Sequence, residues 1–361
     1  MKVALVHDWL IHMRGGEKVL EAFAEVFPDA TIYTLFSDRR NLSPSLQRMK
    51  IRTSILQWFP GICIYYRWLL PLFPLFIKTL RIREAELVIS SSHCVAKGAR
   101  IPQGAYHVCY CHTPMRYLWG FGEVYFEKFP KWVLRCLELV FKRLRRWDLE
   151  TSQQVDTFFC NSEYVKNRIQ IIYGRDAEVI HPPVDIEVFA NDGRPRDPKG
   201  NYYLIVSALT PYKRIDVAIH TFNGWDRTLL IAGDGPLRHR YQKLVKSKNI
   251  QLLGKVSNEE LRRLYGNAKA VIFPQEEDFG IVPLEAQACG TPVIAFGCGG
   301  VLETVEEGVL FYEQTPEAIR EAVLRFESLH FDPERLRRQA LRFDKEEFKN
   351  KIRQALTNVV H

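Results

Sequence analysis

Short apolar runs alternate with stretches of helical periodicity along most of the chain. In the first half, the apolar runs occupy residues 3–6, 87–89, 106–110 and 157–160. After the first run and a glycine turn, residues 19–27 carry apolar side chains at helical spacing. Buried strands that alternate with amphipathic helices are typical of a parallel sheet covered by helices. The first half is therefore predicted to be an α/β domain with a doubly wound parallel sheet.

A polar segment rich in proline and glycine, residues 191–201, interrupts this pattern and indicates a linker. A second alternating series follows, with apolar runs at 202–206, 228–231, 250–253, 270–273 and 292–295. We therefore predict two Rossmann-like domains, residues 1–190 and 191–340, facing across a cleft. Residues 341–361 should form a helix that returns to the first domain. In such sheets, ligands bind at the carboxyl ends of the strands.

Composition agrees with two soluble domains and narrows the chemistry. The chain has 361 residues, of which 47% are hydrophobic and 25% charged. Its eight cysteines are scattered, and the only close pair has no second pair at zinc-site spacing, so we expect reduced thiols and no metal. No run approaches the roughly 18 apolar residues of a membrane span. The amino-terminal residues lack the apolar core of a secretory signal, and we expect a cytoplasmic protein.

The net charge of +8 favours an anionic partner, and its location suggests which kind. Residues 62–83 are aromatic and apolar between arginines and lysines, and residues 127–147 have the pattern of a basic amphipathic helix. We therefore expect a peripheral contact with an anionic membrane, at the inner face of the cytoplasmic membrane. The alternative is an ordinary helix that packs on the sheet and solvates its basic face. No nucleic-acid recognition motif is present, and the oligomeric state is left open.

The most informative segment for chemistry is a strand, glycine turn and helix at residues 270–288. Glu277 and Glu285 flank Gly280 with seven residues between them. A helix N-terminus attracts phosphate, and carboxylates accept hydrogen bonds from sugar hydroxyls. Stabilising acids at an ordinary helix N-terminus would give the same pattern.

Further candidates follow the strands on either side. Lys213 and Arg214, after the strand at 202–206, could neutralise a diphosphate or be solvated charges at a helix start. Gly233 and Gly235, after the strand at 228–231, form a turn signal that fits many folds.

The first domain contributes a glycine pair and a short aromatic motif. Gly15 and Gly16 follow the first strand, where their backbone can approach a ligand. His112 stands at a strand end before a proline turn. Arg116 and Trp119 could clamp an anionic group and stack on a sugar ring, or they could be packing residues.

Together, these motifs resemble the retaining glycosyltransferases of the GT-B fold, of the family 4 type with a Glu-x7-Glu motif. The resemblance extends through the sequence at 286–295 to Gly299 and Gly300. The segment at 110–119 is similar to bacterial mannosyltransferases of polysaccharide and lipopolysaccharide synthesis. The resemblance implies transfer of a sugar, with retention, from a nucleotide-sugar to a glycan or lipid-linked glycan. GDP-mannose is the preferred donor, and no metal or other cofactor is required.

The resemblance also implies roles for individual residues. Glu277 contacts the donor sugar, Lys213 the diphosphate, and His112 the transferred sugar, as the catalytic set. The expected acceptor-binding residues are Arg116 and Trp119. The expected donor-binding residues are Gly15, Gly16, Arg214, Gly233, Gly235, Phe279, Gly280, Ile281, Val282 and Glu285.

One departure keeps other functions open. The arginine that the family carries after the strand at 202–206 is replaced here by Ala208. A nucleotide-sugar-binding scaffold subunit with weak or no catalysis is therefore one alternative. A nucleotide-sugar epimerase of similar architecture is another. An NAD-dependent oxidoreductase is disfavoured, because no Gly-x-Gly-x-x-Gly follows the first strand.

Overall fold

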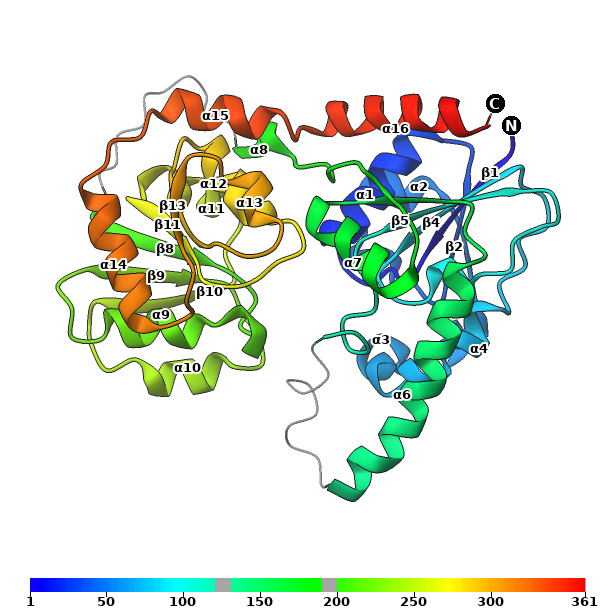
Figure 1. The fold of residues 1–361 in the computed structure, drawn as a ribbon, viewed down its shortest axis with the longest axis horizontal. Helices are drawn as coiled ribbons and strands as arrows, with labels where there is room; N and C mark the ends of the chain where they lie inside the picture. The colour runs from blue at the N-terminus through cyan, green and yellow to red at the C-terminus, as the bar shows by residue number, and fades with distance from the viewer. Residues whose placement is uncertain (121–130, 190–199, 361) are drawn as a thin grey trace. The chain divides into compact units, whose positions relative to one another are not determined.

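A computed structural model describes residues 1–120, 131–189 and 200–360 of the chain (Figure 1). The chain divides into two units. Unit 1 comprises Met1–Pro183 and Phe348–His361, and unit 2 comprises Val184–Glu347. Unit 2 is thus inserted between two segments of unit 1. Nearly all of the predicted linker at 191–201 lies outside the described residues.

Unit 1 is built on a seven-stranded sheet in the order β3-β2-β1-β4-β5-β6-β7. Every pairing is parallel. The central strands are buried, as expected for a sheet covered on both faces. The strands are β1 (Val3–His7), β2 (Thr31–Thr34), β3 (Lys50–Thr53), β4 (Leu87–Ser92), β5 (Tyr106–Cys111), β6 (Thr157–Cys160) and β7 (Glu178–Val179).

The helices of unit 1 follow from apolar spacing and from their caps. Helix α1 buries Val19, Leu20 and Phe23 on one face. The Ser162 hydroxyl accepts the Val165 N–H at the start of α7, a standard N-cap. The α-helices are α1 (Gly15–Val26), α2 (Pro44–Arg48), α3 (Ile62–Tyr65), α4 (Phe73–Ile77), α6 (Lys131–Ser152), α7 (Glu163–Tyr173) and α16 (Lys345–Val360). The 3-10 helices are η1 (Arg39–Asn41), η2 (Ile55–Trp58), η3 (Tyr66–Leu72) and η4 (Ala96–Gly98).

The last helix, α16, completes the core of unit 1. Phe348 and Ile352, four residues apart, are buried in the cluster that contains Leu5 and Phe23. The Phe348 ring packs edge-on against Phe23, at 5.6 Å between centroids, and against Tyr110, at 5.9 Å. This apolar stripe places the end of the described chain in the same unit as its beginning.

Unit 2 has a six-stranded parallel sheet in the order β10-β9-β8-β11-β12-β13. One apolar cluster lies on each face of it. The strands are β8 (Tyr202–Val206), β9 (Thr228–Ala232), β10 (Ile250–Gly254), β11 (Ala270–Phe273), β12 (Val293–Phe296) and β13 (Gly308–Phe311). The helices are α8 (Ile186–Phe189), η5 (Pro211–Lys213), α9 (Ile215–Phe222), α10 (Arg238–Leu244), α11 (Asn258–Asn267), α12 (Ile281–Ala288), α13 (Val301–Thr304), α14 (Pro316–Glu327) and α15 (Pro333–Leu341).

The predicted fold class is confirmed: both units are doubly wound α/β domains around parallel sheets. The predicted basic helix at 127–147 is described from Lys131, and residues 127–130 lie outside the described part. Within it, Leu144 is buried and Val140 and Phe141 pack on the core of unit 1. The apolar face of this part of α6 therefore covers the domain. Among the described helices, none is long and apolar enough to cross a membrane.

Candidate active site

Lys213 and Glu277 form an ion pair at the carboxyl edge of the unit 2 sheet. Lys213 ends η5, which follows β8, and Glu277 follows β11. Because β8 and β11 are neighbouring parallel strands, the segments after them emerge side by side. The Lys213 ammonium contacts a Glu277 carboxylate oxygen, with the side chains 13% and 21% exposed. Two of the three predicted catalytic residues thus lie together, in a position that a ligand can reach.

A pair of glycines holds the segment that carries Glu277. The Gly300 N–H donates to the Glu277 carbonyl oxygen at 2.9 Å. Gly299 has φ 82°, and a Cβ built on it would lie 2.2 Å from the same oxygen. Only glycine allows this approach. The two glycines after β12 therefore fix the position of the acidic loop after β11.

The predicted donor-binding residues after Glu277 form the start of α12. Gly280, with φ 104°, caps the helix, and Ile281 and Val282 follow half-buried in its first turn. The amide groups of this turn lack partners within the helix, which makes it suited to an anion. Phe279 is buried and packs edge-on against Phe343 at 5.7 Å, so its side chain belongs to the core.

Glu285 lies further along α12 and is 9% exposed. Its Oε2 accepts a hydrogen bond from the hydroxyl of Tyr265 at 3.0 Å. Burial, and then the nearby Glu285 carboxylate, raise the pKa of Tyr265, so the phenol keeps its proton and donates. Tyr265 therefore orients Glu285. The sequence gives no signal for this role, because Tyr265 is a lone tyrosine on α11.

Arg214 and Ala208 occupy different parts of the loops around Lys213. Arg214 is left-handed, with φ 49°, and its guanidinium donates to the side chain of Gln314 at 3.0 Å. Gln314 in turn donates to the Pro274 carbonyl oxygen, at 2.8 Å. Arg214 is therefore bound to the loop after β13. Ala208 is exposed.

The glycine turn after β9 packs directly on the segment that contains Ala208. A Cβ at Gly233 would lie 1.9 Å from the Ser207 carbonyl oxygen, and one at Gly235 would lie 2.6 Å from that of Leu209. The two glycines thus allow backbone contact on both sides of position 208. Glycine is required at both positions because the two loops pack closely together, and a turn signal in the sequence does not reveal that contact.

In unit 1, His112 meets the glycine turn after β1. Its Nε2 lies 2.8 Å from the Ser91 Oγ, which also lies 3.1 Å from Nδ1 of His7. A Cβ at Gly16 would lie 3.5 Å from the His112 Nε2. Gly15 begins α1 just before it. Burial, and then the neighbouring His93, lower the pKa of His112 to about 3, so the ring is neutral near pH 7.

Beside His112 lies an ion pair that the sequence analysis missed. The buried Asp8 carboxylate accepts four backbone N–H groups, from residues 93–96, at 2.6–3.0 Å. It also lies 3.0 Å from the His93 Nδ1. Burial alone would raise the pKa of Asp8, but His93 and these hydrogen bonds outweigh it and hold the pKa well below its usual value. Burial would likewise lower the pKa of His93, yet Asp8 raises it. The position of Asp8 just after β1 was the available signal.

The two predicted acceptor residues have partners within unit 1. The Trp119 indole N–H donates to Asp148 at 2.8 Å, and its ring lies 5.7 Å from the Arg145 guanidinium. The half-buried Arg116 lies close enough to His93 to lower its pKa. Arg116 is thus near the His112 region, whereas Trp119 is anchored to α6. Contact of either residue with an acceptor stays a prediction.

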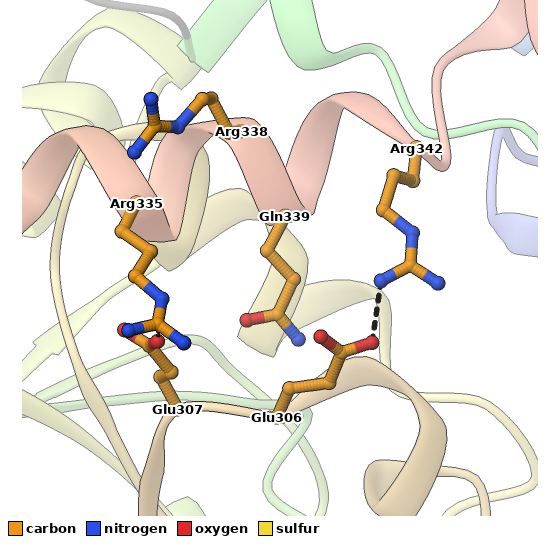
Figure 2. Close-up of a pocket in the computed structure, with 6 residues that line it drawn as sticks. All are labelled: Glu306, Glu307, Arg335, Arg338, Gln339 and Arg342. Atoms are coloured by element: carbon orange, nitrogen blue, oxygen red, sulfur yellow. Dashed lines mark hydrogen bonds and ion pairs between the residues drawn. The ribbon is translucent and has the colours of Figure 1, made fainter.

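A shallow hollow elsewhere in unit 2 contains none of these residues (Figure 2). It lies between the turn after α13 and α15, where Arg335 pairs with Glu307 and Arg342 with Glu306. Gln339 donates to the Thr304 carbonyl oxygen at 3.3 Å. These contacts fasten α15 to unit 2. Within the described residues, no three potential metal-ligating side chains come together.

Comparison with known proteins defines the class. Residues 13–188 match the family model Glycosyltransferase Family 4, and residues 190–343 match the model Glycosyl transferases group 1. The sucrose-phosphate synthase of Thermosynechococcus elongatus has the same fold, with a TM-score of 0.73, 18% identity and 99% of both chains covered. HepE of Anabaena, solved with UDP, gives a TM-score of 0.70 at 17% identity, covering 99% of this chain and 100% of its own. The fold is GT-B.

The two models together span residues 13–188 and 190–343 and support a glycosyltransferase of the family 4 type. An uncharacterized glycosyltransferase of Methanocaldococcus jannaschii is 31% identical over 176 residues, which are 47% of this chain and 49% of the relative. A D-inositol 3-phosphate glycosyltransferase of a Mycobacterium species is 28% identical over 177 residues, 43% of this chain and 40% of the relative. The chain thus spans half or less of the length of these curated relatives.

Proposed function

We propose that the protein transfers a sugar from a nucleoside-diphosphate sugar to a glycan or a lipid-linked glycan, with retention of configuration. The observation that carries this proposal is the Lys213–Glu277 pair at the carboxyl edge of the unit 2 sheet, just before the N-terminus of α12. A cation and a helix N-terminus suit a departing diphosphate, and a carboxylate suits the hydroxyls of the donor sugar.

The roles of the remaining residues are part of the same proposal. Lys213 and the first turn of α12 stabilise negative charge on the leaving group. Glu277 binds the donor sugar, and Glu285, oriented by Tyr265, binds the ribose hydroxyls. The neutral His112 in unit 1 contacts the transferred sugar, and Arg116 and Trp119 contact the acceptor. The acceptor hydroxyl attacks the anomeric carbon from the face that the diphosphate leaves: a new C–O bond forms, the bond to the diphosphate oxygen breaks, and the departing diphosphate takes the hydroxyl proton.

GDP-mannose is the proposed donor, because the segment at 110–119 resembles mannosyltransferases. A UDP-sugar is the competing choice, because HepE of Anabaena was solved with UDP and with UDP-glucose. Calorimetric titration with GDP, UDP and ADP, followed by their sugars, distinguishes the two. Binding of GDP and GDP-mannose alone supports the proposal. Binding of UDP alone replaces the donor but keeps the class of enzyme.

A nucleotide-sugar-binding scaffold is a second candidate, favoured by the alanine at position 208. A scaffold would bind the donor but neither transfer nor hydrolyse it, so turnover of labelled donor separates the two functions. An epimerase would interconvert donor sugars without an acceptor, and the same labelled donor would reveal it.

The proposal includes a peripheral position at the inner face of the cytoplasmic membrane, where a lipid-linked acceptor would be found. The chain carries a net charge of +8, which favours an anionic surface. Cell fractionation tests this position: the protein should sediment with membranes at low salt and be released by high salt.

A further inference from the structure

Residues 55–75 of unit 1 expose an unusual concentration of large hydrophobic side chains. Eight of the seventeen such side chains in the described part of the chain lie in this short segment. Trp58 and Trp68 are 86% and 76% exposed. The other six are Ile55, Phe59, Ile64, Tyr65, Leu72 and Leu75. We call these eight residues the aromatic surface.

The short helices that carry the aromatic surface bury one face in the core and expose the other. The elements η2, α3 and α4 each anchor the segment through buried residues, among them Leu56, Ile62 and Phe73. These anchors belong to one core cluster of unit 1. Because the core is already filled from the other side, the exposed side chains face solvent without a partner among the described residues of unit 1. A surface this apolar on a soluble domain marks an interaction site.

Helix α6 does not supply this surface, although its sequence suggested it. Val140, Phe141 and Leu144 of α6 pack in the same core cluster as Ile62 and Phe73. Figure 1 shows α3, α4 and α6 at the same end of unit 1. The basic residues of α6 that the structure describes as exposed include Lys142, Arg143 and Arg146. Lys142 pairs with Glu138 and Arg146 with Glu150, so the exposed basic residues of the helix are partly neutralised by its own acids. The apolar side chains at 140, 141 and 144 are used in the core and are not part of the aromatic surface.

The charge of the segment that carries the aromatic surface has one sign. Residues 50–83 contain six basic residues and no acidic residue. All six are exposed, and none forms an ion pair within the described part of the chain. They are Lys50, Arg52, Arg67, Lys78, Arg81 and Arg83.

We propose that the aromatic surface, with the basic residues around it, is the face by which the protein lies on an anionic lipid bilayer. Tryptophan and tyrosine favour the bilayer interface, because an apolar ring and a polar group meet there. Basic side chains beside them are attracted to anionic headgroups. A second copy of the chain is a poorer partner, because a symmetric contact would bring two such positive surfaces together.

The inference rests on the proposed function only in assigning the membrane as the source of a lipid-linked acceptor. Binding itself is measured without donor or acceptor. Flotation with vesicles of phosphatidylcholine, alone or with phosphatidylglycerol, should show at least about tenfold tighter binding to the anionic vesicles. Brominated lipid should quench the tryptophan fluorescence of the bound protein.

Two sets of variants separate apolar insertion from charge. Trp58→Ser with Trp68→Ser should weaken vesicle binding by about tenfold or more, because apolar area is lost. The quenching by brominated lipid should also largely disappear, because the two tryptophans nearest the lipid are then absent. The matched control replaces two exposed residues outside the surface, Ile171→Ser and Leu324→Ser, which are 82% and 50% exposed. This control should bind as the unchanged protein does.

For charge, replacing Arg67, Lys78 and Arg81 by glutamine should weaken binding to anionic vesicles by about a hundredfold. The matched control is the exposed unit 2 triple Lys246→Gln, Lys248→Gln and Lys255→Gln.

Three results would overturn the inference. The first is that the unchanged protein does not bind anionic vesicles. The second is that the double tryptophan variant binds them as tightly as the unchanged protein. The third is that the unchanged protein is a dimer in size-exclusion chromatography and the double tryptophan variant is not. Nucleotide titration on the same samples keeps the two proposals apart. Nucleotide binding without vesicle binding removes the membrane face and the proposed peripheral position but leaves the transferase reaction standing. Vesicle binding without nucleotide binding removes the proposed transferase reaction and leaves the membrane face standing.

Discussion

The Lys213–Glu277 pair predicts that two substitutions shift nucleotide affinity in opposite directions. Lys213→Met keeps most of the aliphatic stem but removes the charged ammonium, which lies 5.1 Å from the centre of the Tyr212 ring. A charge-assisted contact with a diphosphate is worth about 1.5–3 kcal/mol, so GDP should bind roughly 10- to 150-fold more weakly. Because only 13% of Lys213 is exposed, solvent screens the charge little, and we expect the upper part of that range.

Glu277→Gln should have the reverse effect on the nucleotide. In the free protein, Glu277 holds the Lys213 ammonium and adds a negative charge beside the proposed diphosphate site. Its removal should tighten GDP binding, by about 1 kcal/mol or roughly fivefold, while abolishing sugar transfer. Calorimetric titration with GDP measures both shifts, and transfer of labelled donor measures activity. Equal weakening by both substitutions would show that the pair acts as a structural brace, and the reasoning would fail.

Three further predictions concern single positions. Ala208→Arg restores the arginine of the family at an exposed site and should tighten GDP binding roughly tenfold, whereas Ala208→Gln should not; equal affinities for both variants would contradict this. Lys97→Met leaves the buried Asp148 without its cation and should lower the free energy of unfolding in urea by about 3–5 kcal/mol, while Lys97→Met with Asp148→Leu should cost less. Burial lowers the pKa of His107 to about 4, so its contribution to stability is full above pH 6.5 and is lost as pH falls toward 4. With His107→Gln, the free energy of unfolding should fall by roughly 3 kcal/mol less between pH 7 and pH 4 than it does in the unchanged protein. An unchanged pH dependence of the unfolding free energy would contradict this prediction.

The sequence predicted those parts of the fold whose signal is local. The strand at Tyr202–Val206 has five consecutive apolar residues, and its predicted bounds are confirmed. Strand β7 has only two residues, and the edge strand β3 is exposed or half-buried along its length, so neither produces an apolar run. Position at an edge is not the reason by itself, because the edge strand β10 was predicted at 250–253; pattern recognition fails where an edge strand has too few apolar residues.

Contacts between distant residues were beyond local patterns. Asp8 binds the backbone of a segment that begins 85 residues later, and Lys97 meets Asp148 across 51 residues. The sequence indicated a turn at Gly233, but the requirement for glycine comes from the Ser207 carbonyl oxygen against it. Such pairings arise only when the sheet order brings separate loops to one edge, and one chain's sequence does not state that order.

The assignment of α16 to unit 1 has a consequence for biosynthesis. A ribosome completes all of unit 2 before it adds the residues from Phe348 onward. Until then, the nascent first unit exposes the part of its apolar core, including the rings of Phe23 and Tyr110, that α16 later covers. The inserted unit can fold during translation, whereas the outer unit must wait for its last helix. A stalled or prematurely terminated chain would therefore contain a folded second unit and an incompletely folded first unit with exposed apolar side chains. We expect chaperones to bind such a chain.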